Sequence, residues 1–248
     1  MKDLQGKAAL VTGGSRGIGA AIVKRLARDG ADVAFTYVSP AGKAKAEAVV
    51  AEVEALGRRA VALQADAADP AAVAAAVAGA ARELGRLDIL VNNAGVYPHG
   101  PFEEVTLEEL DRTLAIHARA AFVGAQAALA HLPEGGRIVS VGSNLVDRVP
   151  FPGIVLYSMS KSALIGFTKG LARELGPRGI TVNLVNPGST DTDMNPADGA
   201  AADFQRGLSA LGRFSEAADI AATVAHLVGP GGRTITGAEF TVDGGTNI

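Results

Sequence analysis

TGGSRGIG, residues 12–19, lies where an apolar run gives way to an amphipathic pattern. The apolar run is KAALVT at 7–12, and the helical pattern extends over about 18–29. Glycines at such a junction allow a tight turn and let an anionic group approach the unpaired N–H groups of a helix N-terminus. The stretch therefore predicts the first strand–helix unit of a parallel sheet, with a dinucleotide phosphate site at the turn. A glycine pattern taken alone is equally typical of a plain turn.

The alternation of strand and helix continues outward from this turn to the end of the chain. Further β-rich runs lie at 31–37, 59–64, 87–92, 136–141, 179–185 and 236–242. Helical patterns separate them, near 41–56, 70–84, 106–132, 156–176 and 216–228. This spacing is typical of right-handed crossovers that cover both faces of a parallel sheet. We expect one doubly wound α/β domain over residues 1–248, with one long irregular segment at 187–214.

Composition and charge argue against binding of nucleic acid, membranes or metal ions. The 248 residues are 48% hydrophobic and carry a formal net charge of -3, and the 23 Lys and Arg residues are scattered, so neither nucleic acid nor a membrane is an expected partner. The chain has no cysteine, and its four histidines lack metal-ligand spacing, so no metal site is expected. Neither a signal peptide nor a membrane-spanning run is visible, and we expect a cytoplasmic protein.

The end of the second predicted strand bears on the choice of cofactor. An NAD site usually carries a carboxylate about 20 residues after the glycines, where it binds the ribose 2′-hydroxyl. No carboxylate occurs from Val33 to Ala46, whereas Arg16 lies inside the glycine turn. A guanidinium group matches the geometry of a phosphate. The sequence therefore favours NADP(H) over NAD(H); the alternative for Arg16 is a solvated surface side chain.

YSMSK, residues 157–161, opens a predicted helix and places Tyr157 and Lys161 one turn apart on the same face. A neighbouring ammonium group stabilises a phenolate and brings the pKa of a tyrosine toward neutrality. The pair would thus form a tunable acid or base. Taken singly, the spacing is also common among surface residues.

Several motifs together resemble the short-chain dehydrogenase/reductase family, in its compact single-domain branch that includes reductases of 3-oxoacyl groups on acyl carrier protein. They are the glycine turn, NNAG at 92–95, SVGS at 140–143, YSMSK, NPGSTDT at 186–192 and TGAEFTVDGG at 236–245. The resemblance covers essentially the whole chain. It implies a Rossmann fold in three layers, α/β/α, around a seven-stranded parallel sheet, with the cofactor across the carboxyl edge.

Matched position by position, the resemblance implies a set of cofactor contacts. These are Gly13, Ser15, Arg16 and Ile18 at the phosphates, Tyr37 and Ser39 with Arg16 at the 2′-phosphate, Asp66 and Ala67 at the adenine, Asn93, Ala94 and Gly95 near the ribose, Tyr157 and Lys161 at the nicotinamide ribose, and Pro187, Thr190 and Thr192 at the carboxamide. Asn93 and Gly95 could instead only shape a turn, and Asp66 could be a helix N-cap.

The resemblance also implies the chemistry. Tyr157 would give its proton to a carbonyl oxygen during reduction by NADPH and act as a base in the reverse direction. Lys161 would lower the pKa of Tyr157, and Ser143 would hold the carbonyl oxygen. Ser143 lies 14 residues before Tyr157. The commonest family spacing is one residue shorter and falls on Asn144, but Ser143 ends the predicted strand as the motif requires.

His117 interrupts the apolar face of the helix predicted at 106–132. A buried imidazole must find hydrogen-bond partners, so it is either a satisfied core residue or part of a site. The resemblance places it where many family members have an asparagine that holds a water linked to the active-site lysine. We hypothesise that His117 takes part in this proton relay as a catalytic residue; the alternative is that it fills the space without relaying anything.

The substrate and the partners are less constrained. The loop at 187–214 mixes apolar side chains with aspartates, which indicates a partly apolar pocket for a small carbonyl or alcohol substrate. Acyl carrier protein is a further candidate, for which Arg173 and Arg178 would be the basic contacts. By resemblance the chain forms a homotetramer or a homodimer. Two alternatives to a carbonyl reductase stay open: a sugar or polyol dehydrogenase, and a catalytically silent NADP-binding protein.

Overall fold

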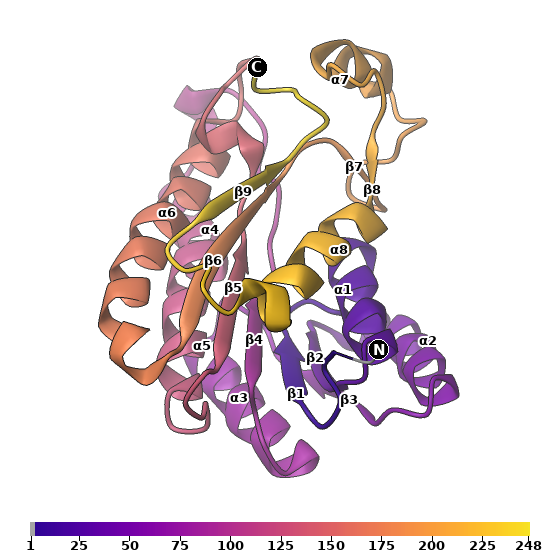
Figure 1. Ribbon diagram of the computed structural model, residues 1–248. Helices are drawn as coiled ribbons and strands as arrows, with labels where there is room; N and C mark the ends of the chain where they lie inside the picture. Colours follow the sequence, from indigo (N-terminus) through magenta and orange to yellow (C-terminus); the bar gives the residue numbers. More distant parts are fainter. Residues whose placement is uncertain (1–2) are drawn as a thin grey trace.

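The computed structural model describes residues 3–248 and contains a seven-stranded parallel sheet (Figure 1). The strand order is β3-β2-β1-β4-β5-β6-β9. The strands are β1 (Ala8–Val11), β2 (Asp32–Tyr37), β3 (Ala60–Gln64), β4 (Ile89–Asn92), β5 (Arg137–Val141), β6 (Thr181–Pro187) and β9 (Glu239–Val242). The central strands β1, β4 and β6 are buried along their whole length because helices cover both faces of the sheet.

Each face of the sheet has its own hydrophobic core. On one face, α1 (Gly17–Arg28), α2 (Lys43–Ala55) and α8 (Ala217–Val228) contribute Ile22, Val49 and Ile220. On the other face, α3 (Pro70–Leu84), α5 (Ala120–Ala128) and α6 (Val155–Leu175) contribute side chains such as Val77 and Ala172. Figure 1 shows these two helical layers with the sheet between them. The predicted fold class is confirmed.

The structure divides the helix predicted at 106–132. It consists of α4 (Leu107–Leu114), a π-helical turn at Ala115–Arg119, and α5, which ends at Ala128. Thr106 caps the start, since its Oγ1 accepts the Glu109 N–H at 3.1 Å. A π turn leaves the ordinary i→i−4 bonding pattern and is frequent at functional sites. The amphipathic pattern alone could not indicate it, because one turn of altered pitch hardly changes which face is apolar.

The segment predicted as an irregular loop, 187–214, contains short elements of its own. They are β7 (Thr190–Asp191) and α7 (Ala202–Leu208), and β7 pairs in parallel with β8 (Ser215–Glu216). Figure 1 shows α7 standing away from the main body, beyond the carboxyl edge of the sheet. The segment is hereafter called the substrate loop.

The order of the strands determines where a ligand can lie. From β1 the chain proceeds outward to β2 and β3, then returns to β4 on the other side of β1. In open α/β sheets, ligands bind at the carboxyl ends of the strands where the order reverses. Here that position is between β1 and β4.

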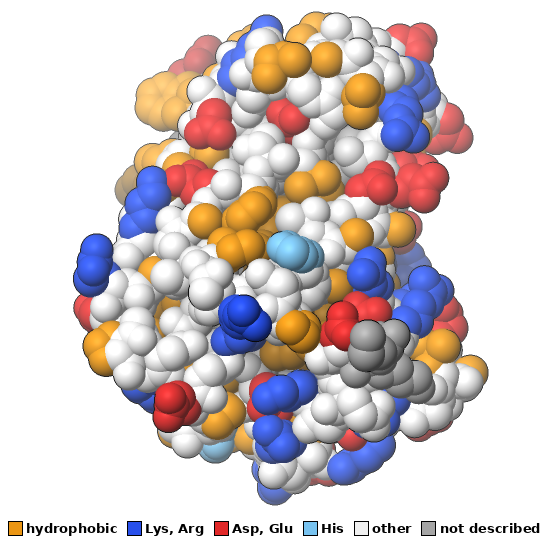
Figure 2. All heavy atoms as spheres, viewed as in Figure 1, with side chains coloured by type: hydrophobic (Ala, Val, Ile, Leu, Met, Phe, Trp, Pro, Cys, Tyr) orange, Lys and Arg blue, Asp and Glu red, His pale blue; other side chains and the backbone are white. Residues whose placement is uncertain are grey.

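The described residues yield no candidate for two other kinds of site. Over residues 3–248, no helix is both long enough and apolar enough to cross a membrane. Within the same range, no group of three or more His, Cys, Asp or Glu side chains could hold a metal ion. Figure 2 shows basic and acidic side chains interspersed over the face that it presents.

Candidate active site

The glycine turn follows β1 and is held in shape by β2. Gly13 adopts a φ of 67°, and its N–H donates to Thr36 Oγ1 at 2.8 Å, while the Gly14 N–H donates to the Thr36 carbonyl at 2.9 Å. A Cβ on Gly19 would lie 2.2 Å from the Gly13 carbonyl oxygen. Glycine is therefore required where α1 approaches the turn. The first turn of α1 carries no acidic residue, and its N-terminus suits an anionic group.

Asn93 joins the ends of β1 and β4, where the strand order reverses. Its Nδ2 donates to the carbonyl oxygens of Thr12 and Gly13, at 2.9 and 3.1 Å. In return, Thr12 Oγ1 accepts the backbone N–H groups of Asn93 and Ala94, at 2.9 and 3.0 Å. These bonds fix the segment after β4 against the glycine turn. They also support the simpler interpretation of Asn93, as a residue that shapes the turn.

A basic groove of about 530 Å³ borders the glycine turn between α1, α2 and α8. Its charged lining residues are Arg16, Lys24, Arg25, Arg28, Lys45, Glu52 and Asp193. Lys45 Nζ lies 2.5 Å from Asp193 Oδ2, and this pair, with the charge of Arg16, lowers the pKa of Asp193. Within residues 3–248, Arg16 forms no ion pair of its own. Its exposed guanidinium is thus available to a phosphate group.

Ser143 and Tyr157 meet at the carboxyl end of β5. The Ser143 side chain lies close enough to the Tyr157 phenol to lower its pKa. The Ser143 N–H donates to Asn186 Oδ1 at 3.1 Å. Asn144, which the commoner spacing would select, points instead toward the last residues of the chain, with Nδ2 3.4 Å from Asp243 Oδ2. The geometry therefore favours Ser143 over Asn144 as the partner of Tyr157.

The pKa values in this region differ from the expectation. Burial raises the pKa of Tyr157, the hydrogen bond with Ser143 lowers it, and the neighbouring Tyr97 raises it further, so that the net shift is upward. Lys161 is not among the groups that move it. Its Nζ donates to the Val141 carbonyl at 2.9 Å, and burial lowers its own pKa to about 8. The effect of Ser143 thus opposes the net upward shift of the Tyr157 pKa.

His117 lies in the π turn, is 3% exposed, and has protein partners on both ring nitrogens. Nε2 accepts the Val96 N–H at 3.0 Å, so the proton of the neutral ring is on Nδ1, which lies 2.8 Å from Ser160 Oγ. The Ser160 hydroxyl donates to the Tyr157 carbonyl at 2.8 Å. Burial, with the charge of Lys161, lowers the pKa of His117 to about 3.

This arrangement bears on the relay hypothesis for His117. A relay needs a ring nitrogen free to hold a water, and here both are bonded to the protein. The ring is also neutral at ordinary pH. The geometry thus favours the other interpretation, a satisfied core histidine, which additionally braces the first turn of α6 through Ser160 and Tyr157.

The remaining predicted residues also lie along the carboxyl edge of the sheet. Ser15 and Ile18 belong to the glycine turn and α1, Tyr37 and Ser39 to the end of β2, Ala67 to the segment after β3, Gly95 to the segment after β4, and Pro187 to the last position of β6. Three predicted side chains already have protein partners. Asp66 accepts the Ala68 N–H at 2.9 Å, Thr190 Oγ1 donates to the Gly188 carbonyl at 3.0 Å, and Thr192 Oγ1 accepts the Asn195 N–H at 3.3 Å.

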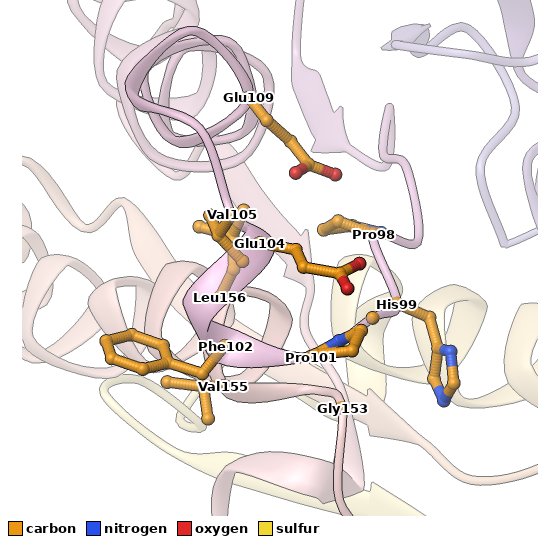
Figure 3. A pocket seen from close by; sticks show the side chains of 11 residues that line it. Pro98, His99, Pro101, Phe102, Glu104, Val105, Glu109, Gly153, Val155 and Leu156 are labelled. Carbon is orange, nitrogen blue, oxygen red and sulfur yellow. The ribbon is translucent and has the colours of Figure 1, made fainter.

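A small cavity of about 140 Å³ lies beside the candidate site (Figure 3). It is lined from the segment after β4, by residues such as Pro98 and Glu104, and from the start of α6, by Val155 and Leu156. Figure 3 shows the carboxylates of Glu104 and Glu109 pointing to the side on which Pro98 lies. The lining includes Pro98 and Leu156, which directly follow Tyr97 and directly precede Tyr157 in the sequence.

Several residues of the site are missing from the sequence interpretation. Thr12, Thr36, Asn186 and Ser160 hold the functional segments in place through the bonds described above, and Tyr97 packs edge-on against Tyr157, with ring centroids 4.9 Å apart. Thr12 could have been found from the sequence, because it directly precedes the glycines of the turn. The others depend on contacts between distant strands and helices, for which the local pattern gives no signal.

Comparison with known proteins gives matches over nearly the whole chain. A family model described as enoyl-(acyl carrier protein) reductase matches residues 13–247. A crystal structure of a short-chain dehydrogenase from Burkholderia cenocepacia J2315 in complex with NADP is 62% identical, with a TM-score of 0.97, over 99% of this chain and 100% of that one. A blue fluorescent protein from a metagenomic library, in complex with NADPH, is 57% identical, with the same TM-score and the same coverage of both chains.

Two further relatives are similar over nearly the whole chain; one is named for a binding function and the other for a reduction. The cyclic-di-GMP-binding biofilm dispersal mediator protein of Escherichia coli K12 is 45% identical over 244 residues, which are 98% of this chain and 98% of that protein. Versicolorin reductase 1 of Aspergillus parasiticus is 38% identical over 255 residues, 98% of this chain and 97% of that protein.

Proposed function

The chain belongs to the short-chain dehydrogenase/reductase family and is an oxidoreductase, and from this premise we propose that it is an NADPH-dependent reductase of ketone or aldehyde carbonyls, acting reversibly on the alcohol. One observation carries the proposal: the Tyr157 phenol lies within the influence of the Ser143 side chain at the carboxyl edge of the sheet, one helical turn before the buried Lys161. A protein that only binds a nucleotide has no need of this arrangement.

The residues of the site fit a phosphorylated dinucleotide. The glycine turn leaves backbone space at the N-terminus of α1, where a side chain on Gly19 would collide with Gly13. Arg16 and the basic groove next to it suit a 2′-phosphate, and β2 ends without a carboxylate that would repel one. The NADP and NADPH found in similar crystal structures agree with the predicted cofactor. When bound, NADPH supplies the hydride.

Each catalytic side chain has a distinct part in carbonyl reduction. Tyr157 donates its proton to the carbonyl oxygen, and its raised pKa keeps it protonated and able to do so at neutral pH. The Ser143 hydroxyl donates a hydrogen bond to the same oxygen as negative charge develops. Lys161, with a pKa of about 8, places a positive charge beneath the site. Ketone, NADPH and one proton give alcohol and NADP⁺.

A panel of ketones and aldehydes, each tested with NADPH and with NADH, tests the proposal. Oxidation of the reduced cofactor is followed by absorbance, with wild type beside Tyr157→Phe. We expect turnover with NADPH that Tyr157→Phe lowers by about 100- to 10,000-fold, while NADPH binding measured by titration is retained. Turnover that survives in Tyr157→Phe would contradict the role of the phenol.

The side chains around Tyr157 favour a substrate with an apolar ring. Tyr97 is 40% exposed beside Tyr157, and Phe151 and Phe204 join the loop before α6 to α7, with ring centroids 5.9 Å apart. Aromatic walls bind flat apolar groups through burial and edge-to-face contacts. The panel should therefore pair aryl ketones with aliphatic ketones of similar size. An α,β-unsaturated thioester and a set of polyols test enoyl reduction and the sugar or polyol dehydrogenase alternative.

A catalytically silent NADP-binding protein is the second candidate, and the Escherichia coli relative named for binding rather than for a reaction favours it. The panel experiment distinguishes a silent NADP-binding protein from an enzyme. NADPH would bind with unchanged affinity in wild type and Tyr157→Phe, and neither would turn over any substrate of the panel. Turnover of any substrate of the panel by wild type would show that the protein is an enzyme.

The assembly and the acyl carrier protein partner are also proposals. Leu107, Phe122 and Met159 are apolar and 47–77% exposed on α4, α5 and α6, which supports a homodimer or homotetramer testable by light scattering. Of the two candidate docking arginines, Arg178 already donates to the Leu132 carbonyl at 2.7 Å. A cytoplasmic location stays a prediction.

A further inference from the structure

The last residues of the chain contact three segments of the candidate active site. We propose that the C-terminal turn, defined as residues 243–247, is a positioning element that fixes Ser143 opposite Tyr157 and ties it to the substrate loop. The inference rests on the proposed function for its catalytic consequence. Its structural part concerns how the Ser143 segment is held and can be tested without turnover.

The first contact is with the residues that follow Ser143. Asn247 Nδ2 donates to the Asn144 carbonyl at 2.7 Å, and Arg148 Nη1 donates to the Thr246 carbonyl at 2.5 Å. Asn144 is 4% exposed, and its Nδ2 lies 3.4 Å from Asp243 Oδ2 and 3.5 Å from Asn247 Oδ1. The segment after β5 is thus bonded to the C-terminal turn through the Asn144 carbonyl of the short helical turn Asn144–Val146 and through the side chain of Arg148.

The second contact is with Gly188, near the start of the substrate loop, and the third is with Ser209 and Leu211, near its end. The Gly188 N–H donates to the Val242 carbonyl at 2.9 Å, and a Cβ on Gly188 would lie 2.5 Å from Asp243 Cβ, so the two segments are in direct contact. The Gly244 carbonyl accepts the Leu211 N–H and the Ser209 hydroxyl, both at 3.0 Å. One short turn therefore meets both ends of the substrate loop.

The C-terminal turn is itself well braced. The Asp243 carboxylate accepts the Gly245 N–H at 2.9 Å and the Asn247 N–H at 3.1 Å, and Thr246 Oγ1 donates to the Asp243 carbonyl at 2.8 Å. Thr246 is 5% exposed. A turn with this many internal bonds can act as a fixed support for the loops that lean on it.

Ser143 is held between this turn and β6. From β6, Asn186 Oδ1 accepts the Ser143 N–H at 3.1 Å, and Asn186 is fully buried. From the other side, the C-terminal turn holds Asn144, the next residue. The direction of the Ser143 hydroxyl therefore depends on both supports, and the hydrogen bond to Tyr157 depends on that direction. Asp243, Asn247 and Asn144 are positioning residues, since they act through Ser143.

The test compares Asn247→Asp with Ile248→Ser. Asn247→Asp keeps the shape of the side chain but removes the Nδ2 donor, whereas Ile248 is 93% exposed and serves as the matched control. In Asn247→Asp we expect kcat for the best ketone to fall about tenfold, as for loss of about 1.4 kcal/mol of transition-state stabilisation, with NADPH affinity within twofold of wild type. The control should match wild type in both.

Two further readouts separate positioning from a general loss of structure. Because the Ser143 side chain lowers the pKa of Tyr157, its displacement should move the alkaline limb of the reduction profile to higher pH, and Ser143→Ala should do the same. Amide hydrogen exchange should accelerate at residues 143–148 and 209–211 but not in the central strands. Asp243→Ala should enlarge both effects, and Asp243→Asn, which keeps one acceptor oxygen, should restore part of them.

Unchanged exchange at 143–148 in folded Asn247→Asp and Asp243→Ala would overturn the inference. So would a fall in kcat without movement of the alkaline limb, because a merely structural defect would give that result. If wild type reduces no ketone, the proposed function fails, while the exchange experiment still decides whether the C-terminal turn holds the Ser143 segment.

Discussion

At the scale of single residues, His117 shows how a polar side chain in a core acquires a defined state. The Val96 N–H bonded to Nε2 fixes the tautomer, and Ser160 accepts the remaining proton on Nδ1. An ideal Cβ on Gly95 would lie 3.3 Å from His117 Nε2 and 3.4 Å from Lys161 Nζ, so the imidazole is close to the buried ammonium. That proximity and the burial both disfavour a charged ring.

The neutral state of His117 has a consequence for stability against pH. Its pKa falls from an ordinary 6.5 to about 3 on folding, so between these values the unfolded chain binds more protons and stability is lost as pH falls. From pH 7 to pH 5 the contribution lost is about 2 kcal/mol. We expect His117→Asn to remove this part of the dependence, measured by urea denaturation at both pH values. An identical pH dependence in wild type and variant would refute the neutral, buried assignment.

The relay hypothesis for His117 is tested with the same variant and with His117→Ala. If the imidazole does not relay protons, His117→Asn keeps the shape of the wild-type profile of turnover against pH. His117→Ala leaves the Val96 N–H without its partner and is expected to lose about 1 to 3 kcal/mol of stability. A changed profile in both variants at unchanged stability would instead favour the relay.

Arg16 governs the expected preference for NADP(H). Its guanidinium is exposed beside the glycine turn and, within residues 3–248, has no ion-pair partner. We expect Arg16→Gln to raise KM for NADPH by roughly 10- to 100-fold, as for loss of a charged hydrogen bond, and to leave KM for NADH nearly unchanged. Arg82→Gln, at an exposed position of α3, is the charge-matched control. Equal effects on both cofactors would show that Arg16 does not recognise the 2′-phosphate.

Residue identities could be predicted from the sequence only where a motif carries them. The glycine turn and the pair Tyr157 and Lys161 are such cases, and the structure brings them to one edge. The choice between Ser143 and Asn144 needs the structure, because it depends on Asn186 in β6 and on Asn247 near the chain end. The expected effect of Lys161 on the pKa of Tyr157 stays a prediction; in the structure the Lys161 ammonium donates to the Val141 carbonyl.

At the scale of elements, the strands and helices follow the periodicity of the sequence closely. The buried strands correspond to continuous apolar runs, because helices cover both faces of the sheet, and the long helices correspond to period-3.6 patterns. The exceptions are the π turn at 115–119 and the short elements α7, β7 and β8. These depend on a local register change or on two-residue pairings, which leave almost no trace in a pattern.

The junction of the glycine turn with α1 has no room for a side chain at Gly19. A Cβ at Gly19 would lie 2.2 Å from the Gly13 carbonyl oxygen and 2.5 Å from Asn93 Nδ2. We therefore expect Gly19→Ala to abolish NADPH binding, measured by calorimetric titration, and to lower the melting temperature. Gly170→Ala is the control, since Gly170 lies inside α6 with nothing within 4 Å of its Cβ position. Normal binding by Gly19→Ala would place the cofactor elsewhere.

At the scale of the whole molecule, the candidate site and a buried ion-pair cluster lie at opposite edges of the sheet. The residues of the candidate site lie at the carboxyl edge, whereas Asp88 lies just before β4, at the amino edge. Its buried carboxylate accepts Arg86 Nε and Nη2 at 2.6 Å, the Ala8 N–H at 3.0 Å and Lys7 Nζ at 3.3 Å. Burial raises the pKa of Asp88, but these bonds lower it more, so the net shift is downward.

Stability and activity should accordingly separate in Asp88→Ala. Removal of the carboxylate leaves the Ala8 N–H and Arg86 without their partner, and we expect a loss of about 2 to 3 kcal/mol in the free energy of unfolding. Well below the melting temperature, kcat and KM should match wild type. A reduced kcat in fully folded Asp88→Ala would mean that the two edges are coupled through the sheet.

The C-terminal turn also sets the order in which the site can form during synthesis. Ser143 and Tyr157 leave the ribosome before the residues that support them, because Asp243 and Asn247 lie later in the chain. Strand β9 pairs with β6 only then, and Asn144 gains its partners in the same event. A nascent chain can therefore contain Ser143, Tyr157 and Lys161 and still lack an assembled active site until residues 243–247 have been made and folded onto β6 and the Ser143 segment.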